Sequence, residues 1–182
     1  MPRHSEVRNL PYSPEQMFDL VADVGSYAEF LPWVVATRIR SRTESELVAD
    51  LMVGFRMVRE TFTSKVALDR PRTIHVEYLE GPLRYLRNDW RFDPDGKGGT
   101  DVHFSVDFEF KQKLFERLAG SFFHEAFRRM VAAFETRARE IYGAGSSRAD
   151  AAASAASATS ASSGADDGSA PGNSRPSATR TA

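Results

Sequence analysis

Two polar residues, Glu60 and Asn88, stand in register with apolar side chains of predicted strands. Glu60 shares a strand face with Phe62, and Asn88 shares one with Trp90. A buried polar group without a partner costs about 1–3 kcal/mol. Either residue could therefore contact the polar head group of a ligand, Asn88 by donating from its amide to a carbonyl oxygen. A bulge that turns one of them toward solvent is the alternative.

Side chains for covalent or metal chemistry are sparse. The chain has no cysteine, which excludes thiolate catalysis, disulfides and cysteine-based zinc sites. No nucleophile elbow, phosphate-binding glycine loop or dinucleotide fingerprint occurs. The glycine-rich stretch 96–99 follows a predicted strand but precedes another strand, so it lacks the helix that binds phosphate. These observations predict a protein that is not an enzyme and needs no cofactor.

The histidines do not favour a metal site. They lie in four separate segments, without the paired spacing typical of metal ligands, at His4, His75, His103 and His124. We expect each of them to be solvated or locally hydrogen-bonded.

The charged residues are balanced, with 24 Lys+Arg against 25 Asp+Glu. A dedicated nucleic-acid-binding protein would usually show a basic excess. Cations in and beside the last predicted helix could still bind anionic lipid or ribosomal RNA: Lys111, Lys113, Arg117, Arg128, Arg129, Arg137 and Arg139. Glutamates are interleaved with them at 116, 125, 135 and 140, which favours a solvated helix face with i,i+4 ion pairs.

The elements that position these residues are indicated by two changes of period. Thr100–Phe110 alternates strictly between apolar and polar residues, as a half-buried strand does. The next segment, Gln112–Tyr142, repeats apolar residues every three or four positions and predicts one long helix with a broad aromatic face. A sheet curled around a helix would bring these two apolar faces together.

The remaining elements complete an α+β domain. The sequence predicts a strand at His4–Leu10, a helix capped by Ser13 and ended by Gly25, and a short helical piece at Ser26–Phe30. Turn residues then separate further strands at Val35–Arg42, Glu46–Val53, Met57–Leu68, Thr73–Leu79 and Arg84–Phe92, ahead of Thr100–Phe110. Short links imply an antiparallel meander. The expected architecture is a helix-grip: a seven-stranded curved antiparallel sheet around the long C-terminal helix.

Aromatic residues are abundant, with 13 Phe, 5 Tyr and 2 Trp, and most fall on the inward faces. Core packing explains any one of them. For the aromatic residues taken together, the alternative to core packing is an apolar ligand cavity between the sheet and the helix. The predicted lining consists of Trp33, Phe62, Tyr78, Trp90, Phe104, Phe108, Phe123 and Phe127, with Asn88 as the polar contact.

The domain is expected to span residues 1–142. From residue 143 onward, the sequence is dominated by Ala, Ser, Gly and Thr, with no aromatic residue, Leu, Ile or Val. Such a segment cannot offset its ordering entropy, so 143–182 is expected to be disordered. Neither a signal peptide nor a run of about 18 apolar residues is present, so we expect a cytoplasmic protein that can touch a membrane surface.

Several motifs occur in one order along this domain: Leu10-Pro11-Tyr12-Ser13, Phe30-Leu31-Pro32-Trp33, Gly81-Pro82-Leu83, Asn88-Asp89-Trp90-Arg91-Phe92, Val106-Asp107-Phe108-Glu109-Phe110 and Ala133-Phe134-Glu135-Thr136-Arg137-Ala138. In this order they resemble the ubiquinone-binding START-like proteins of the polyketide cyclase/dehydrase superfamily, to which the bacterial RatA-type proteins are similar. The resemblance covers about residues 3–142. Val34 replaces a frequent cysteine and Leu83 a frequent phenylalanine, and both changes keep apolar character.

The resemblance implies a function as well as a helix-grip fold. It implies an apolar tunnel for an isoprenoid quinone, and a carrier or chaperone role that supports respiration, with peripheral contact at the inner membrane. It also implies a rival, because some bacterial members are described as toxins that bind the large ribosomal subunit and block subunit association. It leaves the oligomeric state open.

Overall fold

The computed structural model describes residues 3–55, 58–111 and 123–144. Its elements are β1 (Arg3–Leu10), α1 (Pro14–Ala22), a 3-10 turn η1 (Val24–Ser26), α2 (Tyr27–Phe30), β2 (Val34–Arg42), β3 (Glu46–Phe55), β4 (Val58–Asp69), β5 (Thr73–Glu80), β6 (Leu83–Pro94), β7 (Thr100–Phe110) and α4 (Phe123–Tyr142). The predicted order of elements is confirmed. The first part of the predicted last helix, 112–122, and the tail from 145 lie outside the described residues.

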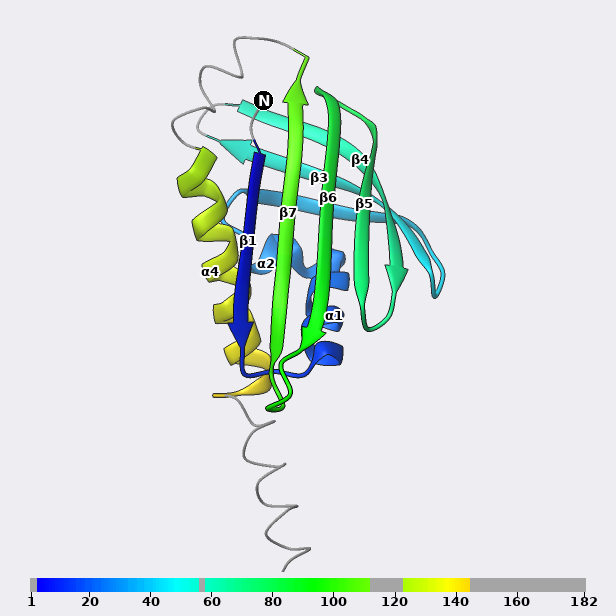
Figure 1. The fold of residues 1–182 in the computed structure, drawn as a ribbon. Helices are drawn as coiled ribbons and strands as arrows, with labels where there is room; N and C mark the ends of the chain where they lie inside the picture. Colours follow the sequence, from blue (N-terminus) through cyan, green and yellow to red (C-terminus); the bar gives the residue numbers. More distant parts are fainter. Residues whose placement is uncertain (1–2, 56–57, 112–122, 145–182) are drawn as a thin grey trace, which may run out of the picture.

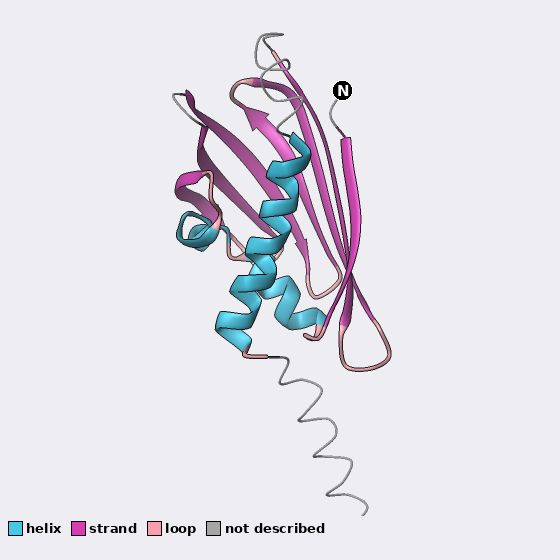
Figure 2. Ribbon diagram, turned by 90° about the vertical axis from the view of Figure 1, so that its left-hand side faces the viewer, coloured by secondary structure: helices cyan, strands magenta, loops and turns pink. Residues whose placement is uncertain are grey.

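The strands form one seven-stranded sheet in the order β1-β7-β6-β5-β4-β3-β2, with every neighbouring pair antiparallel. Strands β2 to β7 therefore form the predicted meander, and β1 joins it at the far edge beside β7 (Figure 1). The sheet curves, and α4 lies across one face of it with α1 and α2 beside it (Figure 2). This is the predicted α+β helix-grip.

The helix α1 begins with a capping box, as predicted. The Ser13 hydroxyl accepts from the Gln16 backbone N–H at 3.2 Å, and the Gln16 side chain accepts from the Ser13 N–H at 2.9 Å. The helix ends at Ala22 instead of continuing to Gly25, because the chain tightens into η1 directly after Asp23. The buried ring of Phe18 then packs edge-on against Phe92 of β6, which closes this end of the sheet.

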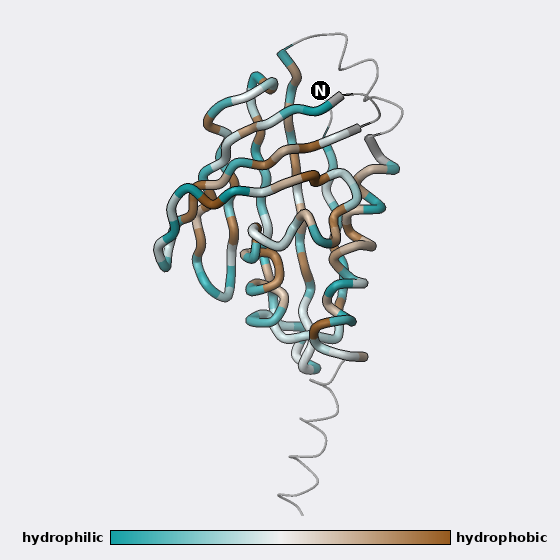
Figure 3. The backbone as a smooth tube through the Cα atoms, turned by 180° about the vertical axis from the view of Figure 1, so that it is seen from behind, coloured by the Kyte–Doolittle hydropathy of each residue, from teal (hydrophilic) through white to brown (hydrophobic). Residues whose placement is uncertain are grey.

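Every second side chain along the strands points inward and packs beneath the helices. On β7, Val102, Phe104, Val106 and Phe108 are buried, whereas the residues between them are half-buried. Figure 3 shows this as polar and apolar positions alternating along the strands. The apolar residues lie on the face that α1 and α4 cover, so any ligand site on this face must be built from core side chains.

Ser64 is a buried polar residue on this face, and it carries our first prediction. It is 1% exposed opposite Ala49, and within the described residues its Oγ has no hydrogen-bond partner. Ser64→Ala should raise the free energy of unfolding by about 1 kcal/mol, because it removes an unpaired buried hydroxyl. Urea denaturation measures the change.

The adjacent Thr63 supplies the matched control. It is also buried, but its hydroxyl donates to Asp50 at 2.7 Å. Thr63→Val should therefore lower the free energy of unfolding by about 1–2 kcal/mol. Equal losses in the Thr63→Val and Ser64→Ala variants would show that Ser64 has an unrecognised stabilising contact.

Candidate functional site

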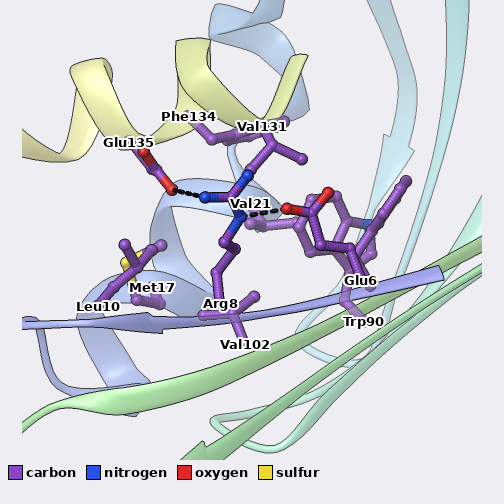
Figure 4. A pocket seen from close by; sticks show the side chains of 11 residues that line it. Glu6, Arg8, Leu10, Met17, Val21, Trp90, Val102, Val131, Phe134 and Glu135 are labelled. Atoms are coloured by element: carbon purple, nitrogen blue, oxygen red, sulfur yellow. Dashed lines mark hydrogen bonds and ion pairs between the residues drawn. The ribbon is translucent and has the colours of Figure 1, made fainter. Parts of the chain in front are cut away.

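A small pocket lies between α4 and the edge of the sheet formed by β1 and β7 (Figure 4). Its wall is apolar and consists of Leu10, Met17, Val21, Trp90, Val102, Phe104, Val131 and Phe134. Its charged residues are Glu6 and Arg8 of β1 and Glu135 of α4, which we call the rim. The enclosed volume is about 20 Å3, which is room for roughly one water molecule. The pocket is therefore closed around its aromatic wall.

Register places the rim over the apolar wall. Glu6 pairs opposite Phe104 and Arg8 opposite Val102, so the inward face of β1 sets charged side chains beside the apolar row of β7. On α4, Phe134 and Glu135 point toward the same space from neighbouring positions (Figure 4). With Met17 and Val21 of α1 and Trp90 of β6, the site is built from five elements, and it joins both ends of the described chain.

The rim is a chain of ionisable groups. Nε2 of His4 lies 3.2 Å from Oε2 of Glu6, and Arg8 Nε donates to the other Glu6 oxygen. A terminal nitrogen of Arg8 then lies 3.8 Å from Oε1 of Glu135, which links β1 to α4 (Figure 4). Burial acts to raise the pKa of Glu6, but hydrogen bonds from Arg8 and His4 outweigh it and hold the pKa below its ordinary value.

Acid should remove the stability that Glu6 supplies. Its pKa is lower in the folded protein than the value of about 4.3 typical of an unfolded chain, so ionised Glu6 stabilises the fold above that pH. This contribution is lost as the pH falls through the folded-state pKa. We expect the difference in free energy of unfolding between the wild type and Glu6→Gln to be full at neutral pH and to shrink in acid.

Urea denaturation from neutral pH into acid measures this difference. Glu77→Gln is the control, because Glu77 pairs with Lys65 at 3.4 Å where both side chains are exposed. A Glu6→Gln difference that stays constant over the whole pH range would contradict the linkage.

The sequence profile described as "Polyketide cyclase / dehydrase and lipid transport" matches residues 10–135. The chain belongs to this family. Within the family, it is 38% identical to the Ribosome association toxin RatA of Escherichia coli K12, over 79% of this chain and 91% of the relative. It is also 38% identical to the mitochondrial Coenzyme Q-binding protein COQ10 homolog B of Xenopus laevis, over 77% of this chain and 59% of the relative.

Solved structures agree with the family's fold. An 18 kDa protein from Caulobacter crescentus is 38% identical, with a TM-score of 0.65 over 79% of this chain and 100% of that one. The Zhui aromatase/cyclase of Streptomyces sp. R1128 has a TM-score of 0.68 over 77% of this chain and 95% of that one. At 18% identity, this second likeness shows the fold alone.

Two of the predicted lining residues, Trp90 and Phe104, line the pocket of this family member, and a third, Phe127, packs behind them. Trp90 and Phe104 form part of its wall, with ring centroids 4.5 Å apart. Phe127 lies beside them, 5.9 Å from Phe104, and stacks on the ring of His4 at 5.4 Å. The imidazole of His4 is therefore held between Glu6 and an aromatic ring, and its side chain is only 16% exposed.

Asn88 lies on the inward face but orients Trp90. Its Oδ1 accepts from Trp90 Nε1, and its Nδ2 donates to the Ser105 carbonyl, both at 2.9 Å. It pairs in regular register with Val76 and Val106, so the predicted bulge alternative does not occur there. Glu60 likewise pairs in register opposite Val53.

The other predicted lining residues lie away from this pocket. Trp33 and Tyr78 are half-buried against the core, and Phe108 packs against Phe110 at 5.4 Å. Phe62 is half-buried on β4, next to Gly81. Phe123 is the first residue of α4, and its side chain lies outside the described part. Their contact with a ligand remains a prediction.

The local contacts predicted for the histidines are confirmed for His75 and His103. His75 lies 2.5 Å from Asp89 and His103 lies 3.1 Å from Asp93, whereas the His124 side chain lies outside the described part. Within ranges 3–55, 58–111 and 123–144, no group of three or more His, Asp or Glu side chains could hold a metal ion. Across the same ranges, no helix is long and apolar enough to cross a bilayer.

Three of the predicted surface cations on α4 lie in two different environments. Arg128 and Arg129 pair with Glu125 at 3.3 Å and 3.0 Å, as predicted for a solvated helix face. Arg137 departs from that prediction because it is half-buried, bonds Glu29 of α2 at 2.7 Å, and lies over the ring of Phe30. It therefore joins α4 to α2.

Sequence reasoning missed the rim and the α4 side of the pocket. Alternation in β1 does place His4, Glu6 and Arg8 on one face with Leu10, and that was the available signal. It could not reveal that this face would meet Glu135, because the pairing partner of an N-terminal strand cannot be deduced from its own sequence.

Proposed function

We propose that the protein binds a hydrophobic small molecule, with ubiquinone as the leading candidate, and acts as a carrier or chaperone that supports respiration. The observation that carries the proposal is an aromatic and aliphatic pocket between α4 and the sheet whose charged groups are confined to one rim. Family membership and the name of the coenzyme Q-binding relative support it. Burial of an isoprenoid tail at about 25 cal/mol per Å2 would supply affinity without covalent chemistry.

Loading requires the pocket to widen. A volume of about 20 Å3 cannot hold a quinone ring. The α4 helix is the movable wall in this proposal, because it contacts β1 through the long Arg8–Glu135 ion pair and the His4–Phe127 ring contact, and β7 through the Phe104–Phe127 ring contact, rather than through a strand ladder. We propose that the protein works by binding rather than catalysis, in the cytoplasm, and touches the inner membrane to exchange its ligand.

The experiment combines extraction and uptake. Lipids extracted from the purified full chain are identified by mass spectrometry, and stripped protein is offered decylubiquinone. Quinone uptake is read from quenching of tryptophan fluorescence, since Trp90 lies in the pocket wall. Protein that is repeatedly lipid-free and takes up no quinone would refute the proposal.

Two matched variants locate the binding site. Val131→Trp would fill the pocket from α4 and should abolish uptake, because Val131 is buried in the pocket wall. Val7→Trp makes the same change at a side chain that is 57% exposed on β1, and it should not alter uptake. Equal uptake by both variants would show that the ligand lies elsewhere.

A second candidate function is binding to the large ribosomal subunit, which would inhibit translation. The named RatA relative favours it, and the exposed side chains of Arg128 and Arg129 on α4 offer phosphate contacts. Charge reversal at these two residues should abolish co-sedimentation with large subunits, which should also weaken as salt rises. The pocket variant Val131→Trp should have no effect. Absence of co-sedimentation at low salt would exclude this function.

A further inference from the structure

The rim of the pocket holds one cation between two carboxylates. Arg8 Nε donates to Glu6, while Arg8 Nη1 lies 3.8 Å from Glu135 Oε1, which is an ion pair but not a hydrogen bond. The Glu135 side chain is 30% exposed, and that of Glu6 is 18% exposed. Arg8 therefore neutralises Glu6 directly and Glu135 only in part.

We propose that Glu135, supported by Glu6, is a charge filter that admits apolar ligands with a neutral carbonyl head group and excludes ligands of the same shape with an anionic head group. The inference rests on the proposed function, because it assumes that the head group lies at this rim. Glu6, Arg8 and Glu135 together carry one net negative charge. The apolar wall behind them strengthens repulsion of a like charge, because screening is weaker there than in water.

Arg8 could instead be expected to attract a carboxylate or phosphate. Two features of the rim oppose this. The charge of Arg8 is already matched by Glu6 through a direct hydrogen bond. The pKa of Glu6 is held below its ordinary value, so the Glu6 carboxylate stays ionised at neutral pH. A second carboxylate, that of Glu135, stands on the opposite wall where an anionic head group would enter.

A neutral acceptor fits the same rim. A guanidinium has five N–H donors, and within the described residues Arg8 is seen to donate one hydrogen bond, from Nε. Its guanidinium lies between β1 and α4, beside the apolar wall (Figure 4). A quinone or ester carbonyl can accept from the guanidinium nitrogens without adding charge.

The test uses two probes with the same acyl chain, one with an anionic carboxylate head group and one with a neutral methyl ester. Laurate and its methyl ester share one acyl chain, and each is titrated against the full chain loaded with decylubiquinone, with recovery of tryptophan fluorescence as the readout. For the wild type, the dissociation constant of the ester, measured by displacement of the quinone, should be at least tenfold lower than that of laurate. For Glu135→Gln, this ratio of dissociation constants should fall about tenfold, toward equality.

Control variants separate the filter from general effects. Glu135→Asp keeps the charge and should keep the discrimination. Glu125→Gln makes the same change on the same helix, where Glu125 pairs with Arg128 and Arg129 away from the pocket, and it should leave the ratio unchanged. If Glu135→Gln does not fold, Glu6→Gln should lower the ratio in the same direction.

The outcomes are distinguishable. Equal binding of laurate and ester by the wild type, or an unchanged ratio in Glu135→Gln, overturns the charge filter while the proposed function stands. Failure of decylubiquinone to bind at all overturns both. A ratio that narrows in Glu135→Gln and persists in Glu125→Gln and Glu135→Asp supports the inference.

Discussion

Replacing Phe134 with alanine is expected to lower the free energy of unfolding by about 3–5 kcal/mol. Phe134 is 4% exposed, and its ring meets those of Tyr27 at 5.5 Å, Phe30 at 5.2 Å and Trp90 at 5.4 Å, all edge-on. One side chain of α4 thus contacts two rings of α2 and one ring on the sheet. Alanine would leave a cavity at the junction and remove edge-on aromatic contacts, each worth about 0.5–1.5 kcal/mol beyond area burial.

Chemical denaturation of Phe134→Ala measures the loss, with Phe110→Ala as the matched control. Phe110 is half-buried at the end of β7, where its ring meets Phe108. Its removal should cost only about 1–2 kcal/mol. If the two variants lose the same free energy of unfolding, Phe134 does not anchor α4 as described.

Replacing Gly81 with alanine should also destabilise the protein strongly, by about 3–5 kcal/mol. Gly81 connects β5 to β6 with φ +135°, a conformation that side-chain-bearing residues rarely adopt. A Cβ there would lie 2.8 Å from Phe62 Cβ and 2.9 Å from both Phe62 Cα and the Thr61 carbonyl oxygen. Two of these three atoms belong to the backbone, so relief would require β4 to move.

A variant at Gly96 separates the cost of backbone strain from the cost of a steric clash. It also has a positive φ, +72°, but a Cβ would meet nothing within 4 Å. Gly96→Ala should therefore cost only about 1 kcal/mol, from backbone strain alone. The melting temperatures of the two variants make the comparison, and equal shifts would argue that the close approach at Gly81 is relieved without cost.

The elements of this fold follow from local patterns, and their ends are the least determined part. The strand from Thr100 to Phe110 has the predicted bounds, because apolar and polar residues alternate without interruption. The start of α1 is equally well specified, because Ser13, Pro14 and Gln16 form a complete cap. The strand β6 extends one residue earlier and two later than predicted, because pairing with β7 continues beyond the apolar run.

The site was only partly predictable. Trp90 and Phe104 could be identified because their strands show which face is inward. The roles of Phe134, Glu135 and Arg137 depend on which side of α4 meets the sheet and which side meets α2. A helix with glutamate and arginine near an aromatic stripe does not specify this by itself. Long-range placement, rather than local propensity, built the charged rim.

The pairing of β1 with β7 has a consequence for the order in which the protein assembles. Each of the other ladders joins strands that are neighbours in the sequence, but this ladder places Arg3 opposite Asp107. At a synthesis rate of about 5–20 residues per second, β1 leaves the ribosome roughly 5–20 seconds before its partner. Non-local pairing of this kind is slow to form, because the entropy of loop closure is lost before the contacts between the strands stabilise the fold. We expect the edge of the sheet that carries Glu6 and Arg8 to be completed among the last folding events, after the meander has formed.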